Sequence, residues 1–252
     1  MKYALLDGKK IEPQKGLRAI CPYCGDEVIA KCGSVKMHHW AHTSESNCDK
    51  WKENELPWHR NWKNQFPAEW QERIFTDIQT GEKHIADICT AHNFVIEFQH
   101  SPISEEEKRS REHFYKNMCW IADLSGKRDR KRFFDKASFL FQCYGNIDNF
   151  GSKIYTIDNP LKILPKKWAD RTVFVCLDFK GDSLDPMYEC LWSIVPILLQ
   201  TDKAVTIQLN RQVFIEHVKN NTLPIFFDDV KNRLNKLLQE RADRWHIHPI
   251  RK

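Results

Sequence analysis

Two acidic residues, Asp87 and Glu97, stand on either side of a short polar segment within residues 84–101. Runs rich in Ile, Val, Phe and Cys flank the polar residues Thr90–Asn93, which is the pattern of a β-hairpin. If Ala91–Asn93 form a three-residue loop, Asp87 lies opposite Glu97 on the neighbouring strand. Directly opposed residues of an antiparallel pair share one face of the sheet. The sequence therefore predicts two carboxylates side by side.

The same register sorts the other residues of this hairpin into two faces. The apolar residues fall together on one face, namely Ala86, Ile88, Phe94, Ile96 and Phe98, and a slip by one residue would mix the two sets. The other face carries Asp87, Glu97 and Gln99. Opposed buried carboxylates repel each other unless a cation lies between them, and their oxygen atoms suit Mg²⁺ or Mn²⁺. The pattern indicates a metal site; the alternative is that one carboxylate is solvated at a sheet edge.

A second candidate metal site precedes the hairpin. It combines a CxxC pair with an HxxH pair, separated by fourteen residues, and its members are Cys21, Cys24, His39 and His42. Thiolate and imidazole in a Cys₂His₂ set are ligands that tetrahedral Zn²⁺ prefers, and four protein ligands close the coordination shell of a structural site. His38 or Cys48 is an alternative to one histidine. The competing interpretation is a CxxC pair that is redox-active or incidental.

Composition is that of an ordinary soluble domain or pair of domains. The chain has 252 residues, of which 41% are hydrophobic and 29% charged, and a formal net charge of +5. Nine scattered cysteines do not suit a secreted disulfide framework. No apolar run is long enough to cross a bilayer, and the N-terminus lacks the apolar region of a signal peptide. We therefore expect a cytoplasmic protein without a membrane span.

Helices and strands around the hairpin are expected to position the acids. A helix opening at Pro57 places His59 and Lys63 one turn apart on one face, with Glu53 and Glu55 just upstream. A strand is expected over Gln71–Ile78.

A second helix follows the hairpin. Its capping box, Ser104–Glu107, predicts a helix to about Met118, on which Lys108, Arg111 and Tyr115 share one face. A further strand follows over Met118–Leu124, so the predicted order is helix, three strands, helix, strand.

The rest of the chain carries little chemistry. Lys127–Arg132 is a basic run, interpreted as a solvated loop, with a loop that binds a nucleic-acid backbone as the alternative. A buried strand is expected over Thr172–Phe179. Helices are expected over Asp185–Thr201, Arg211–Lys219 and Asp228–Arg244.

Taken together, the motifs between Met1 and Leu124 resemble the competence protein CoiA-like family. They occur in the family's order: Cys21-Pro-Tyr-Cys24, His39-Trp-Ala-His42, His59, Lys63, Ala86-Asp87, Ile96-Glu-Phe-Gln-His-Ser101 and Arg111-x-x-x-Tyr115. The resemblance implies an α/β fold with a restriction-endonuclease-like PD-(D/E)XK core and a small N-terminal zinc-binding module. It implies three regions: the zinc module 1–49, the nuclease-like core 50–132 and a C-terminal α/β region 133–252 of unknown role.

The resemblance also assigns roles to single residues. Asp87 corresponds to the acid of the second core strand, and Glu97-Phe-Gln99 to the (D/E)xK element with Gln in place of Lys. An amide can position the attacking water but cannot deprotonate it, so the basic role falls to Lys63, Lys108 or Arg111, or activity is weak or absent. Glu53 or Glu55 corresponds to the helix carboxylate of the superfamily.

The expected function is that of a metal-dependent DNA nuclease that processes incoming, single-stranded DNA for recombination. Asp87 and Glu97 would hold Mg²⁺ or Mn²⁺, and a structural Zn²⁺ would hold the N-terminal module. Contacts to phosphate are expected from His59, Lys63, Lys108, Arg111 and Tyr115. The rival functions are a non-catalytic protein that binds single-stranded DNA or loads a recombination partner, and a zinc-held interaction module in phage defence.

Overall fold

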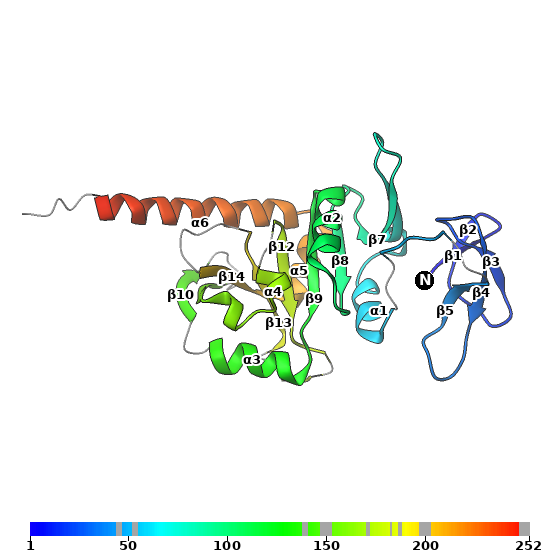
Figure 1. Cartoon of the computed structure of the whole chain (residues 1–252), viewed down its shortest axis with the longest axis horizontal. Coiled ribbons are helices and arrows are strands. Elements are labelled where there is room, and N and C mark those ends of the chain that lie inside the picture. The colour runs from blue at the N-terminus through cyan, green and yellow to red at the C-terminus, as the bar shows by residue number, and fades with distance from the viewer. Residues whose placement is uncertain are drawn as a thin grey trace, which may run out of the picture. The chain divides into compact units, whose positions relative to one another are not determined.

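A computed structural model describes residues 1–43, 47–51, 55–137, 141–146, 153–169, 172–181, 183–185, 188–196 and 203–246. The chain divides into two compact units, Met1–Trp120 and Ile121–Lys252 (Figure 1). Unit 1 contains both metal sites predicted from the sequence, the Cys/His site and the site of Asp87 and Glu97. None of the described helices is long and apolar enough to cross a membrane.

Unit 1 begins with a small antiparallel sheet. Its strands are β1 (Ala4–Leu6), β2 (Lys9–Ile11), β3 (Arg18–Ile20), β4 (Glu27–Lys31) and β5 (His39–His42), in the order β2-β1-β3-β4-β5. The turn between β1 and β2 is Asp7-Gly8, with both residues at positive φ, as a tight hairpin turn requires. Buried residues of its strands, such as Ala4, Val28 and Trp40, form its hydrophobic core.

The second half of unit 1 follows the predicted order of helix, three strands, helix and strand. Its elements are α1 (Pro57–Lys63), the 3₁₀ turn η1 (Ala68–Trp70), β6 (Gln71–Thr76), β7 (Lys83–Cys89), β8 (Val95–Gln99), α2 (Glu105–Tyr115) and β9 (Met118–Asp123), and the strands lie in the order β6-β7-β8-β9. Pro57 occupies the first turn of α1, where its missing N–H costs nothing. The Ser104 hydroxyl caps α2 by accepting a hydrogen bond of 3.0 Å from the Glu107 N–H.

The hairpin β7–β8 has the predicted register. Ile88 pairs with Ile96 and Cys89 with Val95, and the Thr90 N–H donates to the Phe94 carbonyl at 2.9 Å across the loop. All five residues of the predicted apolar face are buried: Ala86, Ile88, Phe94, Ile96 and Phe98. Loop length and alternation therefore sufficed to place Asp87 and Glu97 on adjacent strands.

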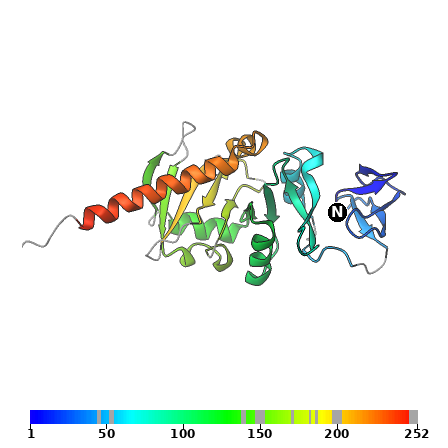
Figure 2. The ribbon, with the colours of Figure 1, turned by 90° about the horizontal axis from the view of Figure 1, so that it is seen from above.

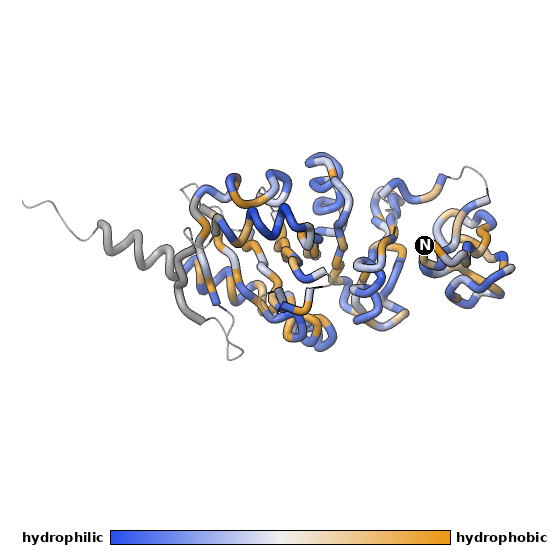
Figure 3. Tube along the Cα trace, turned by 90° about the horizontal axis from the view of Figure 1, so that it is seen from below, coloured by the Kyte–Doolittle hydropathy of each residue, from blue (hydrophilic) through white to orange (hydrophobic). Residues whose placement is uncertain are grey.

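Unit 2 is a second α/β arrangement. Its elements after β9 are α3 (Lys127–Ala137), β10 (Phe141–Asn146), β11 (Lys153–Asp158), η2 (Pro160–Lys162), α4 (Lys166–Ala169), β12 (Phe174–Asp178), β13 (Cys190–Ile194), β14 (Lys203–Asn210), α5 (Arg211–Lys219) and α6 (Leu223–His246). The strands lie in the order β12-β13-β14-β11-β10, with α3 and α6 on opposite faces (Figures 1 and 2). Figure 3 shows hydrophobic and hydrophilic residues interspersed along the chain trace.

Two sequence predictions in unit 2 were wrong. Lys127–Arg132 forms the first turns of helix α3 rather than a loop. The segment predicted as a helix over Asp185–Thr201 contains strand β13, and residues 197–202 lie outside the described residues. Both sides of β13 are paired, with β12 and β14, and an apolar run buried in this way cannot be told from a helix by periodicity. The helix Arg211–Lys219 is confirmed, and the last helix starts earlier than predicted, at Leu223.

Candidate functional site

Three cysteines and one histidine gather at the edge of the N-terminal sheet. Their ligand atoms all lie within 4.8 Å of one another, and the four residues, named here the cysteine–histidine cluster, are Cys21, Cys24, His42 and Cys48. The Sγ atoms of Cys21 and Cys48 are 3.9 Å apart, and Cys24 Sγ is 3.2 Å from His42 Nε2. The cysteines whose side chains the structure describes are all free thiols.

His39 is not part of this cluster; Cys48 takes the place predicted for it. Side chains alternate between the two faces of a strand, so His39 and His42, three positions apart on β5, point to opposite faces. His42 shares its face with Trp40, which is fully buried in the core, whereas the His39 Nδ1 pairs with the Met37 carbonyl at 2.8 Å. Cys48 was the alternative that the sequence left open.

The cluster fits a tetrahedral zinc ion. Zn–S bonds of about 2.3 Å set two ligand sulfur atoms about 3.8 Å apart, close to the separation of Cys21 and Cys48. The CxxC turn is closed by the Gly25 N–H, which donates to the Cys21 carbonyl, with Gly25 at φ +81°. The neighbouring Cys48 thiol, together with nearby N–H groups, lowers the pKa of Cys21 to about 4, and a thiolate is the form that binds metal.

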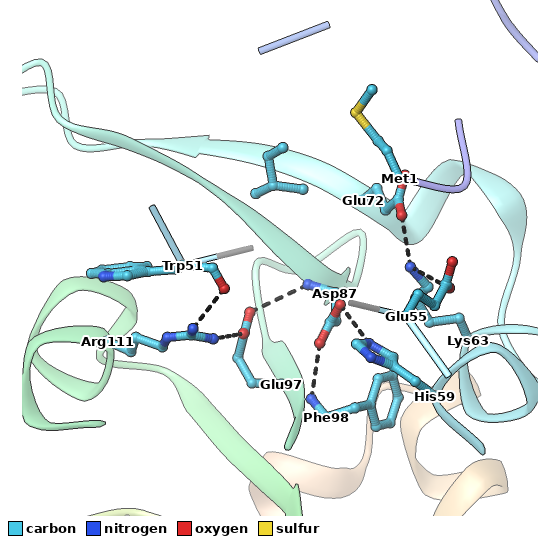
Figure 4. A pocket seen from close by; sticks show the side chains of 11 residues that line it. Met1, Trp51, Glu55, His59, Lys63, Glu72, Asp87, Glu97, Phe98 and Arg111 are labelled. Carbon is cyan, nitrogen blue, oxygen red and sulfur yellow. Dashed lines mark hydrogen bonds and ion pairs between the residues drawn. The ribbon is translucent and has the colours of Figure 1, made fainter. Parts of the chain in front are cut away.

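The acids of the central hairpin line a second site, a cavity of about 50 Å³ in unit 1. Its lining residues are Met1, Trp51, Glu55, His59, Lys63, Glu72, Ile85, Asp87, Glu97, Phe98 and Arg111 (Figure 4). Met1 comes from the start of the chain; the others come from α1, β6, β7, β8 and α2, and from the segment that precedes α1. Asp87 and Glu97, named here the acid pair, are joined by a hydrogen bond of 3.2 Å from the Asp87 N–H to Glu97 Oε1.

Each member of the acid pair has a basic partner. His59 Nε2 lies 2.7 Å from Asp87 Oδ1, while the Phe98 N–H donates to Asp87 Oδ2 at 3.0 Å. Arg111 Nη1 donates to Glu97 Oε2 at 3.0 Å. The cation that the opposed carboxylates require is thus supplied in part by the protein itself.

The two carboxylates have opposite pKa shifts. Burial, with the nearby Asp87 carboxylate, raises the pKa of Glu97 to about 8 against the opposing effect of Arg111. Burial also acts on Asp87, but His59 and Lys63 outweigh it and hold the pKa of Asp87 below its ordinary value. Two carboxyl groups in one desolvated site cannot both ionise freely. The basic side chains around this pair therefore do not fully compensate two negative charges.

Lys63 is paired with two further acids. Its ammonium lies 2.8 Å from Glu55 Oε1 and 2.7 Å from Glu72 Oε1, and Glu55 also pairs with Arg60. Burial disfavours the charged amine, yet Glu72 and Glu55 raise the pKa of Lys63 above its ordinary value. Glu55 is the upstream acid that reaches the cavity, and Glu53 lies outside the described residues.

Glu72 is a site residue that sequence reasoning missed. Its carboxylate accepts hydrogen bonds from the backbone N–H groups of Lys2 and Tyr3 at 2.8 and 3.0 Å as well as from Lys63. Its backbone is at φ +49° within β6, a conformation that is uncommon for residues other than glycine. Its partners lie far away in the sequence at Lys2 and Tyr3, so no local pattern could have singled it out.

The residues predicted to contact phosphate from α2 are buried. The Lys108 ammonium pairs with Glu112 at 3.4 Å, Arg111 contacts Glu97, and Tyr115 packs against Trp51 and Phe114. None of the three is presented on the surface, and only Arg111 lines the cavity. The helix face that they share is the buried, inner face of α2.

Gln99 lies on β8 two residues after Glu97 and is buried. Its amide nitrogen donates to the Ser101 carbonyl at 3.0 Å, and Gln99 is not among the residues that line the cavity. His59, Lys63, Asp87, Glu97 and Arg111 do line it.

The sequence matches two known families of domains. Residues 7–50 match the N-terminal domain of competence protein CoiA, and residues 75–163 match its nuclease-like domain. The chain belongs to the competence protein CoiA family. No curated protein and no solved structure matches the chain.

The two matches coincide with the two sites. The match to the CoiA N-terminal domain contains all four residues of the cysteine–histidine cluster. The match to the CoiA nuclease-like domain contains Asp87, Glu97 and Arg111, whereas His59 and Lys63 precede it. The family accordingly links the acid pair to a nuclease-like domain and the cluster to a separate N-terminal one.

Proposed function

We propose that this chain is a divalent-metal-dependent deoxyribonuclease of the PD-(D/E)XK type. The observation that carries the proposal is the acid pair: Asp87 and Glu97 project from adjacent antiparallel strands into one cavity. The order of helix, three strands, helix and strand supports it, as does the match to a nuclease-like domain. Residues 1–49 would then form a zinc-binding module, residues 50–132 the nuclease core, and residues 133–252 an additional α/β region.

Asp87 and Glu97 are the residues that would hold Mg²⁺ or Mn²⁺. Each carboxylate oxygen has a second acceptor position besides the contact described above, and the raised pKa of Glu97 marks a site short of positive charge. A divalent ion bound there would polarise a phosphate oxygen and lower the pKa of a water molecule. The donor set of two carboxylates is of the kind that these hard cations prefer.

The protein's own side chains would orient the acid pair and the phosphate. His59 fixes one oxygen of Asp87, and Arg111 fixes one oxygen of Glu97. Gln99 occupies the position of the lysine in the (D/E)xK element; its amide can hydrogen-bond a water molecule but cannot accept the proton of that water. The substrate would be DNA, in single-stranded form during competence, and the protein would act in the cytoplasm with recombination proteins.

A cleavage assay with matched variants tests this proposal. Full-length protein is incubated with labelled single- and double-stranded DNA and Mg²⁺ or Mn²⁺. The wild type should cleave, and Asp87→Asn and Glu97→Gln should not, although both should bind DNA as tightly or more tightly because an acid that repels phosphate is gone. Glu106→Gln, which removes an exposed acid from α2, serves as the control and should cleave normally. Equal cleavage by Glu97→Gln and the wild type would place the active site elsewhere.

A non-catalytic DNA-binding function is the second candidate. It is favoured by the state of the basic groups: Lys63 is enclosed by Glu55 and Glu72, Arg111 is paired with Glu97, and residue 99 is an amide. A wild-type protein that binds single-stranded DNA but is inert with every metal would support this function. A protein that neither cleaves nor binds DNA would instead support the zinc-held interaction module.

A further inference from the structure

The segment Cys48–Trp51, named here the strap, runs from the cysteine–histidine cluster to the acid pair. We propose that Asp49 and Trp51 of the strap are positioning residues through which metal binding at the cluster orders the acid pair. The inference rests on the proposed function in one respect, since it concerns the same pair of acids.

Asp49 fastens the strap to β7. It directly follows Cys48, so the cluster ligand and the anchor are adjacent along the chain. The Asp49 side chain is 1% exposed; its Oδ2 accepts a hydrogen bond of 2.6 Å from the Ile85 N–H, and its Oδ1 lies 2.8 Å from His84 Nδ1. Ile85 is two residues before Asp87 on the same strand. A shift of Asp49 therefore acts on the strand that carries one of the two acids.

Trp51 connects the strap to the other acid. Its ring stacks on His84 with the ring centroids 3.2 Å apart and the planes inclined by 13°. Its carbonyl accepts a hydrogen bond of 2.6 Å from Arg111 Nη2, while Nη1 of the same guanidinium donates to Glu97. Figure 4 shows Arg111 between the Trp51 carbonyl and the Glu97 carboxylate. Hydrogen bonds to the Trp51 carbonyl of the strap and to the Glu97 carboxylate thus position the Arg111 guanidinium.

These contacts form one continuous path from Cys48 to both members of the acid pair. The path passes through the Trp51 backbone carbonyl, whose position depends on how firmly the strap that leads to it is held. The Cys48 thiolate bound to a metal would hold the strap at one end, and Asp49 holds it just after. Without the metal the strap loses that fixed end, so Arg111 loses a well-placed acceptor and Glu97 loses a well-placed donor.

Coupling of this kind has a reciprocal consequence. If zinc at the cluster raises the affinity of the acid pair for a divalent ion by some factor, that ion must raise zinc affinity by the same factor. The direction of the effect follows from the contacts: both ions favour the ordered strap, so binding at either site should strengthen binding at the other.

Manganese titration of the full-length protein tests the proposal. Mn²⁺ binding is measured by calorimetry, with Asp87→Asn as the reference that lacks the site, and zinc content is measured in the same samples. Asp49→Asn should retain zinc and bind Mn²⁺ at least tenfold more weakly than the wild type. Trp51→Ala should behave likewise, whereas Trp51→Phe, which keeps a ring over His84, should bind Mn²⁺ nearly as the wild type does.

Asp77→Asn is the matched control. Asp77 also accepts backbone hydrogen bonds next to β7, but its donors are Gln79 and Thr80 of its own turn rather than residues of β7 or the strap. This variant should change neither zinc content nor Mn²⁺ affinity. Zinc-free wild type should show the same Mn²⁺ loss as Asp49→Asn. Unchanged Mn²⁺ affinity in both Asp49→Asn and zinc-free protein would overturn the proposal.

Hydrogen exchange separates failure of this inference from failure of the nuclease proposal. Asp49→Asn with zinc bound should exchange amide hydrogens faster in peptides of β7 and of the Arg111 turn of α2, and normally in peptides of β3 and β4. If the wild type binds no Mn²⁺ but this pattern appears, the strap acts as inferred and the metal-dependent function is wrong. If exchange in β7 and α2 is unchanged, the strap does not position these elements, whatever the acid pair binds.

Discussion

The guanidinium of Arg111 and the carboxylate of Glu97 form a buried ion pair with an N–O distance of 3.0 Å. Both side chains are 4% exposed, so neither charge has water to stabilise it in the absence of the other. The sequence pattern predicts a substrate contact for Arg111; in the structure its guanidinium pairs with Glu97. Arg111 opposes the effects of burial and of Asp87 on the pKa of Glu97, which nevertheless lies at about 8.

Loss of Arg111 should therefore be costly. Above the pKa of Glu97 of about 8, where the acid ionises, Arg111→Met leaves an uncompensated buried carboxylate and should lower the free energy of unfolding by about 3–5 kcal/mol. Part of that loss should be recovered below the pKa of Glu97, where the acid is protonated. Urea denaturation at several pH values measures both effects. Arg109→Met, on the exposed side of the same helix, is the control, and an equal loss in this variant would argue against a specific pair.

The cysteine–histidine cluster should bind about one zinc ion per chain. Cys48→Ser should lose the metal and destabilise the N-terminal sheet, because Cys48 completes the ligand set. His39→Asn should keep the metal, since His39 points away from the cluster. Metal analysis after extensive dialysis distinguishes the two variants. Zinc lost from His39→Asn and kept by Cys48→Ser would restore the ligand set that the sequence first suggested.

Glu72 predicts how stability depends on acid pH. Burial alone would raise its pKa, but Lys63 and the Lys2 N–H hold the pKa of Glu72 well below the ordinary value. Its stabilising effect is thus complete above the unfolded-state pKa of about 4.3 and is lost as pH falls toward the folded-state value. Glu72→Gln should be less stable than the wild type by about 3 kcal/mol at pH 7.

The difference in unfolding free energy between the wild type and Glu72→Gln should become smaller as the pH is lowered from about 5 to 2. The reason is that the wild type alone loses the interactions of the ionised Glu72 carboxylate. Thermal or urea unfolding across that range measures the difference directly. A gap that stays constant with pH would mean that Glu72 is not ionised in the folded protein at neutral pH.

Gln99 is the position at which the proposed nuclease departs from the (D/E)xK pattern. Gln99→Lys should preserve DNA cleavage or raise its rate, by up to ~10²-fold if the amine takes part in proton transfer. The neighbouring acid pair would compensate the introduced charge. Single-turnover cleavage rates measure the effect, with Gln99→Ala as the comparison. A rate that falls in Gln99→Lys as far as in Gln99→Ala would indicate that the amide itself is required.

Local features were determined by the sequence alone. The hairpin register followed from a three-residue loop and the alternation of apolar residues, and these two local features were enough to place Asp87 opposite Glu97. The helix starts at Pro57 and Ser104 likewise depend on hydrogen bonds within a few residues, such as the Glu107 N–H to the Ser104 hydroxyl. Interactions over such short distances along the chain are encoded in local residue patterns.

Only the tertiary structure decided which residues complete each site. Cys48 takes the place of His39 in the cluster. Side chains alternate between the two faces of strand β5, so His39 and His42 point to opposite faces despite their HxxH spacing. Lys63 pairs with Glu72. Arg111 contacts both Glu97 and the carbonyl of Trp51, which lies sixty residues away in the sequence. Strand β13 forms because β12 and β14 supply pairing on both sides. Each of these outcomes depends on partners distant in sequence, and an isolated motif contains no information about which distant group will meet it when the chain folds.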